Sequence, residues 1–204
     1  MRKKLIMSKK HILAIAALSV LAAAPALAQD FKAGDLLVRA RAVHLNSANK
    51  DSTGLDLSIN NKWLPEVDFT YFLSPNLAAE LILTVPQKHT LSAGSAEIGS
   101  LKHLPPTLSL QYHFPMGAIK PYVGAGLNYT RFSSVNLPAG VDIKRNSVGA
   151  ALQVGLDIPV GKDLYLNLDV KKVYLGTKVS AGGSEIGKFK VDPVLIGVGL
   201  GWKF

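Results

Sequence analysis

The last eleven residues of the chain, VLIGVGLGWKF, alternate between large and small side chains. Read with the period of two of a β-strand, they place on one face Val194, Ile196, Val198, Leu200, Trp202 and Phe204. The opposite face holds Leu195, glycines and Lys203. A strand of a soluble sandwich turns polar residues outward, but here the second face is nearly empty. We therefore predict that the large residues face lipid and that the glycines face the inside of a narrow barrel.

Seven earlier segments alternate in the same way. Their expected ranges are residues 35–44, 64–73, 77–88, 106–114, 121–132, 147–158 and 164–177. An even number of alternating strands in series is typical of a transmembrane barrel, and the sheet must close because lipid cannot satisfy an open strand edge. We predict an all-β fold, an eight-stranded antiparallel transmembrane β-barrel of the outer-membrane type.

The connections between these segments are alternately short and long. Residues 74–76, 115–120 and 159–163 are short and rich in proline and glycine, whereas residues 45–63, 89–105, 133–145 and 178–190 form longer connections. Short periplasmic turns and long external loops are the rule in outer-membrane barrels. Both termini are therefore expected in the periplasm.

The first 28 residues have the layout of a secretory signal peptide. A basic opening precedes an apolar stretch at residues 12–24, and Ala26-Leu27-Ala28 fits a small-x-small cleavage site. We predict that residues 1–28 are removed and that residues 29–204 form the barrel in the bacterial outer membrane. Translation starts at Met1 or at Met7, since either leaves a basic opening.

Composition narrows the class of protein further. Five of the 23 basic residues lie in the signal segment, so 18 basic residues face 14 acidic ones in the rest of the chain, a balance of +4. This weak balance gives no reason to expect a nucleic-acid partner. The chain has no cysteine, which excludes disulfides and thiolate metal sites.

Aromatic residues gather near the ends of the lipid-facing set, as expected for interfacial girdles. Phe69, Tyr71 and Tyr112 belong to the periplasmic end, and Tyr129 and Tyr174 to the outer boundary. The adjacent lysines Lys171-Lys172 interrupt the alternation. Either a β-bulge lies there or one lysine points outward and reaches the lipid phosphates.

Four stretches of the chain resemble the OmpW family of small outer-membrane barrels, and the similarity extends over the whole mature chain. They are WLPEVDFTYFLSPNLAAEL at residues 63–81, LPPTLSLQYHF at 104–114, KPYVGAGLNYTRF at 120–132 and the terminal DPVLIGVGLGWKF. The resemblance implies that Phe204, with Trp202 beside it, belongs to a signal read by the outer-membrane assembly machinery. It also implies uptake of small apolar compounds.

The inward positions predict two zones in the lumen. The lower zone is a plug of charged residues that must pair, namely Arg39, Arg41, Glu66, Asp68, Glu80, Asp157 and Asp169. The upper zone is an apolar pocket open to the outside, formed by Val43, Ile82, Phe132, Val173, Leu175, Val191 and Leu195. The alternative for the upper set is that these residues only fill space. With the resemblance, we interpret them as a site for a small hydrophobic ligand.

A plug on the axis requires another way out for an apolar ligand. Proline donates no ladder hydrogen bond, and Pro65, Pro86 and Pro193 lie within or beside strands in the external half. We take them as candidates for a lateral gate into the membrane. The alternative is that they merely end strands in tall external hairpins.

Other chemistry finds little support. The glycine-rich stretches at residues 124–126 and 197–201 precede no helix and so lack a phosphate-binding helix end. Ser109 and His113 share a face but lie four residues apart along one strand, too far to pair. His44, His89 and His103 are expected near one another at the external rim, but nothing in their spacing demands a metal. We expect no catalytic residue, no enzyme activity, no cofactor and no metal site.

Three functions remain open from the sequence. The first is passive uptake of small hydrophobic molecules, the second is a narrow ion-conducting pore, and the third is a surface or stress-response barrel whose loops act as a receptor. The expected partners are outer-membrane lipid and lipopolysaccharide, small hydrophobic molecules and the assembly machinery.

Overall fold

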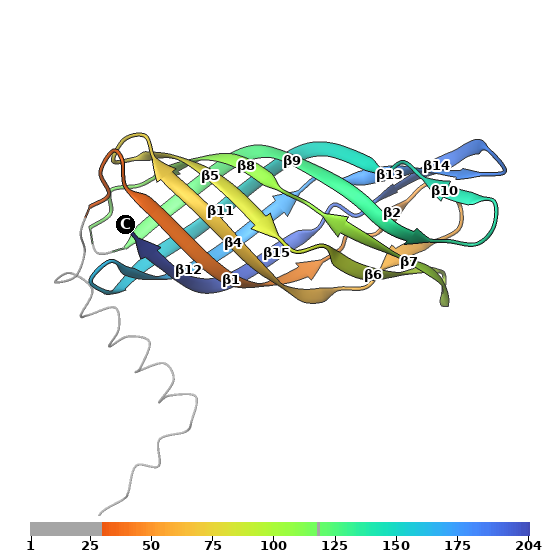
Figure 1. Ribbon diagram of the computed structural model, residues 1–204, viewed down its shortest axis with the longest axis horizontal. Helices are drawn as coiled ribbons and strands as arrows, with labels where there is room; N and C mark the ends of the chain where they lie inside the picture. The colour runs from red at the N-terminus through yellow and green to blue at the C-terminus, as the bar shows by residue number, and fades with distance from the viewer. Residues whose placement is uncertain (1–29, 118) are drawn as a thin grey trace, which may run out of the picture.

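The computed structural model describes residues 30–117 and 119–204, and it forms a long closed β-barrel (Figure 1). The expected signal segment lies outside the described residues. The barrel strands are β1 (Leu36–Asn46), β4 (Lys62–Phe72), β5 (Leu77–Thr84), β8 (Thr107–His113), β9 (Lys120–Asn136), β11 (Asn146–Gly161), β12 (Leu164–Val173) and β15 (Val194–Lys203). Within the described residues, no helix is long and apolar enough to cross a membrane.

The barrel closes through antiparallel pairing of neighbouring strands. The order is β11-β12-β15-β1-β4-β5-β8-β9, and β9 pairs again with β11. The seam between the first and last strands runs from Leu37↔Lys203 to Asn46↔Val194. The amide of Phe204 donates to the Leu36 carbonyl at 2.8 Å, so the last residue of the chain is part of this seam. The predicted eight-stranded antiparallel barrel is confirmed.

The long external connections are themselves strands, which the sequence pattern did not indicate. They contain β2 (Lys50–Asp51), β3 (Leu57–Ile59), β6 (Gln87–Ala93), β7 (Ala96–Leu104), β10 (Val141–Ile143), β13 (Gly176–Ala181) and β14 (Ser184–Lys190). Strands β7, β6 and β3 continue the barrel sheet, while β10, β13, β14 and β2 form a second sheet. Positive φ angles at Gly94, Gly182 and Gly183 allow the tight hairpin turns. The wall therefore extends well beyond the strands that cross lipid.

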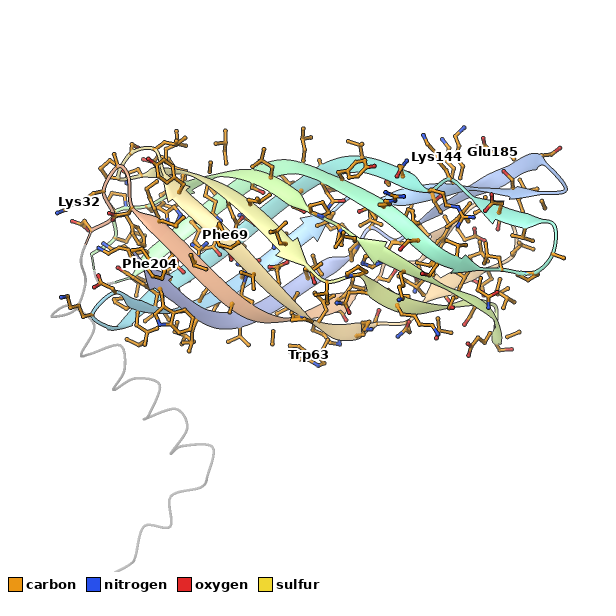
Figure 2. The ribbon with its side chains drawn as sticks, viewed as in Figure 1. Lys32, Trp63, Phe69, Lys144, Glu185 and Phe204 are labelled. Carbon is orange, nitrogen blue, oxygen red and sulfur yellow. The ribbon has the colours of Figure 1, made fainter. Side chains whose placement is uncertain are left out.

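Alternation decides which side chains face the lumen. On β4 the buried set is Leu64, Glu66, Asp68, Thr70 and Phe72, and the exposed set is Trp63, Pro65, Val67, Phe69 and Tyr71. Trp63 projects away from the wall in Figure 2. The apolar outer set is therefore available to acyl chains, as the sequence predicts.

The two adjacent lysines of β12 do not break the pattern. Lys171 points inward and is 1% exposed. Lys172 points outward, where its ammonium donates to the Asp192 carbonyl and lies 5.8 Å from the centre of the Tyr174 ring. The register of β12 shows no shift at these residues, so the alternative of a bulge is wrong.

Inward glycines make room for large polar side chains. A Cβ atom on Gly199 would lie 2.1 Å from the Ala40 carbonyl oxygen and 2.7 Å from Arg41 Cγ. One on Gly155 would lie 2.2 Å from the Tyr122 ring. Because real Cβ atoms do not approach so closely, these two positions need glycine for space rather than for backbone freedom.

Candidate functional site

The structure places all seven side chains of the predicted plug inside the barrel, none of them more than 6% exposed. Arg39 on β1 is the centre of one group. Its Nη1 donates to Asp68 Oδ1 at 2.9 Å, and its Nε and Nη2 donate to the two oxygens of Asp157 at 3.0 and 2.7 Å. The guanidinium thus bridges carboxylates from β4 and β11, with bidentate geometry at Asp157.

Arg41 organises a second group one step nearer the outside. Its Nε lies 3.0 Å from Glu66 Oε1, and its Nη2 lies 2.5 Å from Asp68 Oδ2 and 3.2 Å from Glu80 Oε1. Lys171 Nζ lies 3.0 Å from the same oxygen of Glu66. Lys171 was missing from the predicted plug, although strict alternation along β12 places it inward.

Neutral polar side chains complete the network. The Tyr122 hydroxyl donates to Asp169 Oδ2 at 2.9 Å, Asn167 Nδ2 to Asp157 Oδ1 at 2.8 Å, and Gln153 Nε2 to Glu80 Oε2 at 2.6 Å. Some of these contacts join neighbouring strands, as Asn167 with Asp157, and others cross the lumen, as Gln153 on β11 with Glu80 on β5. Buried charges that are paired and hydrogen-bonded in this way can remain in a narrow interior.

An apolar floor lies on the periplasmic side of the plug. Phe31, 3% exposed, stacks on Phe72 with ring centres 4.1 Å apart and packs with Tyr165 and Leu37. The ring of His113 lies 5.4 Å from that of Phe31. The segment before β1 therefore fills the periplasmic mouth, which alternation could not predict because Phe31 precedes the strand.

The seven apolar residues predicted for the upper lumen all face inward. Six are no more than 4% exposed, and Leu195 is half-buried. Four of them, Ile82, Val173, Leu175 and Leu195, line a cavity of only about 30 Å³, whose wall also includes Glu66 and Lys171. Side chains therefore largely fill this zone, and its base touches the plug.

A larger apolar cavity, which we call the external chamber, lies between the external strands. Its volume is about 210 Å³, and it is lined by Leu55, Leu57, Leu91, Ala93, Ile98, Leu101, Leu137, Pro138, Val141, Ile143, Thr177, Val179 and Phe189. Leu57, Leu101 and Phe189 share one continuous apolar cluster with Phe132, Val173 and Leu175 of the upper lumen. Short alternations such as Leu57-Ser58-Ile59 were the only sequence signal for this wall.

A family model described as the OmpW family matches residues 32–204. The chain belongs to the OmpW family. An outer-membrane protein of Sinorhizobium fredii, y4mB, is 45% identical over 161 residues, 74% of this chain and 70% of that protein. Outer membrane protein W of Vibrio cholerae is 31% identical over 218 residues, covering 96% of this chain and 100% of its own. The crystal structure of OprG from Pseudomonas aeruginosa, 27% identical, matches with a TM-score of 0.72 over 85% of this chain and 97% of that one. The protein is thus a barrel of the bacterial outer membrane.

The three prolines predicted as a gate differ in exposure and in their place relative to the strands of this OmpW-family barrel. Pro65 is exposed within β4, where it pairs with Ala42. Pro193 is buried, and its carbonyl accepts the Val173 amide at 3.1 Å. Pro86 is exposed between β5 and β6. Pro86 and Pro193 both lie at interruptions of the strand ladder. Backbone hydrogen bonds from Val173 to Pro193 and from Val191 to Leu175 bridge the gap at Pro193. The interruption at Pro86 separates β5 from β6.

That interruption has prolines on both sides. Pairing between β5 and β8 stops at Ile82↔Thr107, and pairing between β6 and β7 begins at Gln87↔His103. Pro86 lies on one side of the gap, and Pro105 and Pro106 lie on the other. The side chain of Asn128 donates to both of these carbonyls at 3.2 Å, which anchors the segment to β9.

Two histidines are stacked in the external part of the wall. The rings of His89 and His103 lie 4.6 Å apart and nearly parallel, and both are at most 1% exposed. Strands β6 and β7 continue outward beyond Trp63 and Tyr129, so the pair lies outside the lipid-crossing segments. Burial, with smaller contributions from His89 and Lys62, lowers the pKa of His103 to about 3. Burial also lowers the pKa of His89, so both rings are neutral at pH 7.

Proposed function

We propose that the protein gives passive entry to small hydrophobic molecules, which bind in the external chamber and leave sideways into the membrane. The observation that carries the proposal is the chamber itself, an apolar cavity of about 210 Å³ whose lining side chains pack in one cluster with those of the apolar upper lumen. An apolar cavity of about 150 Å³ is enough to bind benzene. The chamber therefore suits compounds of one or two rings, or alkyl chains of similar size.

The plug argues for a sideways exit. A ligand that moved inward from the chamber would meet Glu66 and Lys171, then the two arginine groups, and then the apolar floor around Phe31. Opening this path requires separating ion pairs in a narrow interior, which costs several kcal/mol, on the order of 3–5, for each partner removed. The same pairing opposes steady ion conduction.

The interruption between β5–β6 and β7–β8 supports a lateral route. Here the ladder lacks hydrogen bonds between residues 83–86 and 104–106, and proline cannot donate them. The inner side of the gap touches the upper cavity, since Thr84, His103 and Pro105 all line it. We assign the gate to Pro86 with Pro105 and Pro106, with Pro65 and Pro193 at its periphery.

The test is uptake of 1-naphthylamine, a fluorescent compound of two rings that is within this size range, by cells that lack or carry the gene. We expect Val179→Trp, which fills the chamber, to reduce uptake towards that of cells without the protein. Val154→Trp makes the same change on the lipid face, where Val154 is 55% exposed, and is the matched control. Equal uptake by the Val179→Trp and unaltered proteins would end the proposal.

The lateral exit needs its own experiment. Pro86→Val with Pro105→Val supplies the missing donors and is expected to slow release of 1-naphthylamine into the membrane while leaving the chamber intact. Unchanged uptake by this double variant, together with reduced uptake by Val179→Trp, would retain the chamber and reject the exit.

A further inference from the structure

We infer that the outer wall of the barrel carries a binding site for the phosphorylated headgroup of lipopolysaccharide, built from Lys144, Lys178, Lys188 and Lys190. This site is separate from the uptake route, because it lies on the outside of the second external sheet. Figure 2 shows Lys144 on the outer side of the barrel, at the end remote from Lys32 and Phe204.

Strand register places three of the lysines in one row. Lys178 on β13 pairs directly with Lys188 on β14. On the other side of β13, the Lys144 amide donates to the Lys178 carbonyl at 2.9 Å, which continues the register of β10. Residues directly opposite each other share a face of a sheet, and Lys190 follows two residues after Lys188 on that face. All four side chains are exposed, while Val179 and Phe189 between them point into the chamber.

The row is only partly neutralised by the protein. Lys178 Nζ lies 2.6 Å from Glu185 Oε2. Within residues 30–117 and 119–204, Lys144, Lys188 and Lys190 have no carboxylate within ion-pair distance. Like charges directly opposite one another destabilise a sheet. An external anion would relieve this repulsion.

A hollow beside the row provides a bounded site. It has a volume of about 370 Å³, and its lining includes all four lysines. It forms where the β11–β12 ladder ends at Ala151↔Val173 and β13 turns away to pair in the other sheet. The one carboxylate of the lining, that of Asp192, is 8% exposed and accepts the Leu175 amide at 2.9 Å through Oδ1. Positive charge therefore predominates.

The membrane-facing edge of the hollow is apolar. Val148, 71% exposed, and Tyr174, 45% exposed, form this edge. A free phosphate makes no use of such an edge, whereas a lipid places acyl chains against it and its phosphate above. The combination favours a lipid over a soluble anion.

Height along the barrel agrees with a headgroup site. Tyr174 belongs to the outer aromatic boundary, and Gly176↔Lys190 and Lys178↔Lys188 follow two and four residues later. With about 3.3 Å per residue along strands tilted by about 40°, these pairs lie roughly 5 and 10 Å above Tyr174. The interfacial layer adds about 5–8 Å to each side of the hydrocarbon core. The lysines therefore meet the phosphorylated sugars of the outer leaflet, and lysine is a common ligand of phosphate.

A second lysine pair in the same barrel is a control. Lys88 and Lys102 are also directly opposite each other, on β6 and β7, but neither lines the hollow. Lys88→Gln with Lys102→Gln removes the same charge as Lys188→Gln with Lys190→Gln. The two double variants separate a local site from general attraction to a basic rim.

The experiment is native mass spectrometry of the full barrel in detergent, titrated with diphosphoryl lipid A, enzymatically dephosphorylated lipid A or inorganic phosphate. Each lysine near a charged lipid surface contributes about a factor of five in affinity, so Lys188→Gln with Lys190→Gln should weaken lipid A binding about thirtyfold. The Lys88→Gln, Lys102→Gln control should retain the affinity of the unaltered protein. Heat-modifiable migration on gels checks that each variant is folded.

Four results would overturn the inference. Equal loss in both double variants would show a diffuse basic rim. Equal binding of dephosphorylated lipid A would show that the phosphates are not recognised. Inorganic phosphate that binds as tightly as lipid A would identify a site for a soluble anion rather than a lipid. Retention of lipid A by Lys188→Gln with Lys190→Gln would likewise reject the site.

Discussion

Arg39 on β1 and Asp157 on β11 are joined by two hydrogen bonds of 3.0 and 2.7 Å, although β15 and β12 separate their strands in the sheet. The contact therefore runs across the lumen. It is possible because Gly201 leaves space beside Arg39, where an added Cβ would lie 3.1 Å from Arg39 Cγ. The glycines on the inward face of β15 thus provide the space that the charged side chains of the lumen occupy.

Replacing Arg39 by methionine should destabilise the barrel strongly. Asp68 and Asp157 would keep buried carboxylates without the guanidinium, and removal of one partner from a buried ion pair costs about 3–5 kcal/mol. The free energy of unfolding in urea, followed by tryptophan fluorescence in lipid vesicles, measures the loss. Arg39→Met with Asp157→Asn should regain part of it. Lys162→Met, an exposed lysine in a turn, is the control, and a similar loss there would contradict the explanation.

Truncating Phe31 should loosen the periplasmic end. The side chain is 3% exposed and stacks on Phe72, and Phe→Ala changes in cores cost about 3–5 kcal/mol. We expect Phe31→Ala to lower the free energy of unfolding by about 3–5 kcal/mol. Met116→Ala, at a side chain 61% exposed in a nearby turn, should have little effect. Equal values for the two variants would mean that Phe31 does not form a packed floor.

Adding one methyl group at Gly199 should be more harmful than adding one at Gly161. At Gly199 the new Cβ meets the Ala40 carbonyl oxygen at 2.1 Å, whereas at Gly161 the nearest atom is 3.5 Å away. Overpacking typically costs about 1–3 kcal/mol, so Gly199→Ala should lose at least this much while Gly161→Ala stays near neutral. The free energy of unfolding in urea, measured for both variants, tests this prediction. If Gly199→Ala loses no stability, the backbone of the wall must shift to accept the methyl group at little cost.

The external hairpin of β6 and β7 should lose stability in acid. Burial lowers the pKa of His103 to about 3, against 6.5 for the free side chain, so between these values the open hairpin binds protons that the folded one does not. The stability of the hairpin is greatest above about pH 6.5. Below that pH it falls by up to about 1.4 kcal/mol per pH unit for each of the two histidines. Hydrogen exchange of the β6 and β7 amides from pH 7 to pH 4 reports this locally. In His103→Gln the slope should be halved, and an unchanged slope would exclude the pair as its cause.

The sequence pattern predicted the lipid-crossing part of the fold because lipid imposes strict alternation there. Strand β4 follows that rule at every position, and β15 follows it from Leu195 onward. Outside the membrane both faces of the wall can be polar or mixed, so β2, β10 and β14 produced no readable period, and β3 offered only three alternating residues. Their pairing depends on contacts between distant segments, as in Phe189↔Asp51.

The candidate site divides in the same way. Arg41 and Glu66 could be assigned to the lumen from alternation alone. Their partners from non-adjacent strands, Glu80 for Arg41 and Lys171 for Glu66, could not, because strand order does not fix which side chains meet across the interior. The external chamber was missed since Leu91, Val141 and Val179 lie in stretches expected to be loops. Phe31 was missed since it belongs to no strand.

The seam between β1 and β15 has a consequence for how the barrel is made. Arg39 stands on the first barrel strand, and Asp157 follows 118 residues later. Asp68 lies directly opposite Arg39 on the neighbouring strand β4, so its carboxylate reaches the guanidinium as soon as β1 and β4 pair. The rest of the guanidinium remains hydrated while the sheet grows, and Asp157 reaches it only as the two ends of the sheet meet. Water leaves the interior in that last step, so closure of the barrel and dehydration of its lumen occur together.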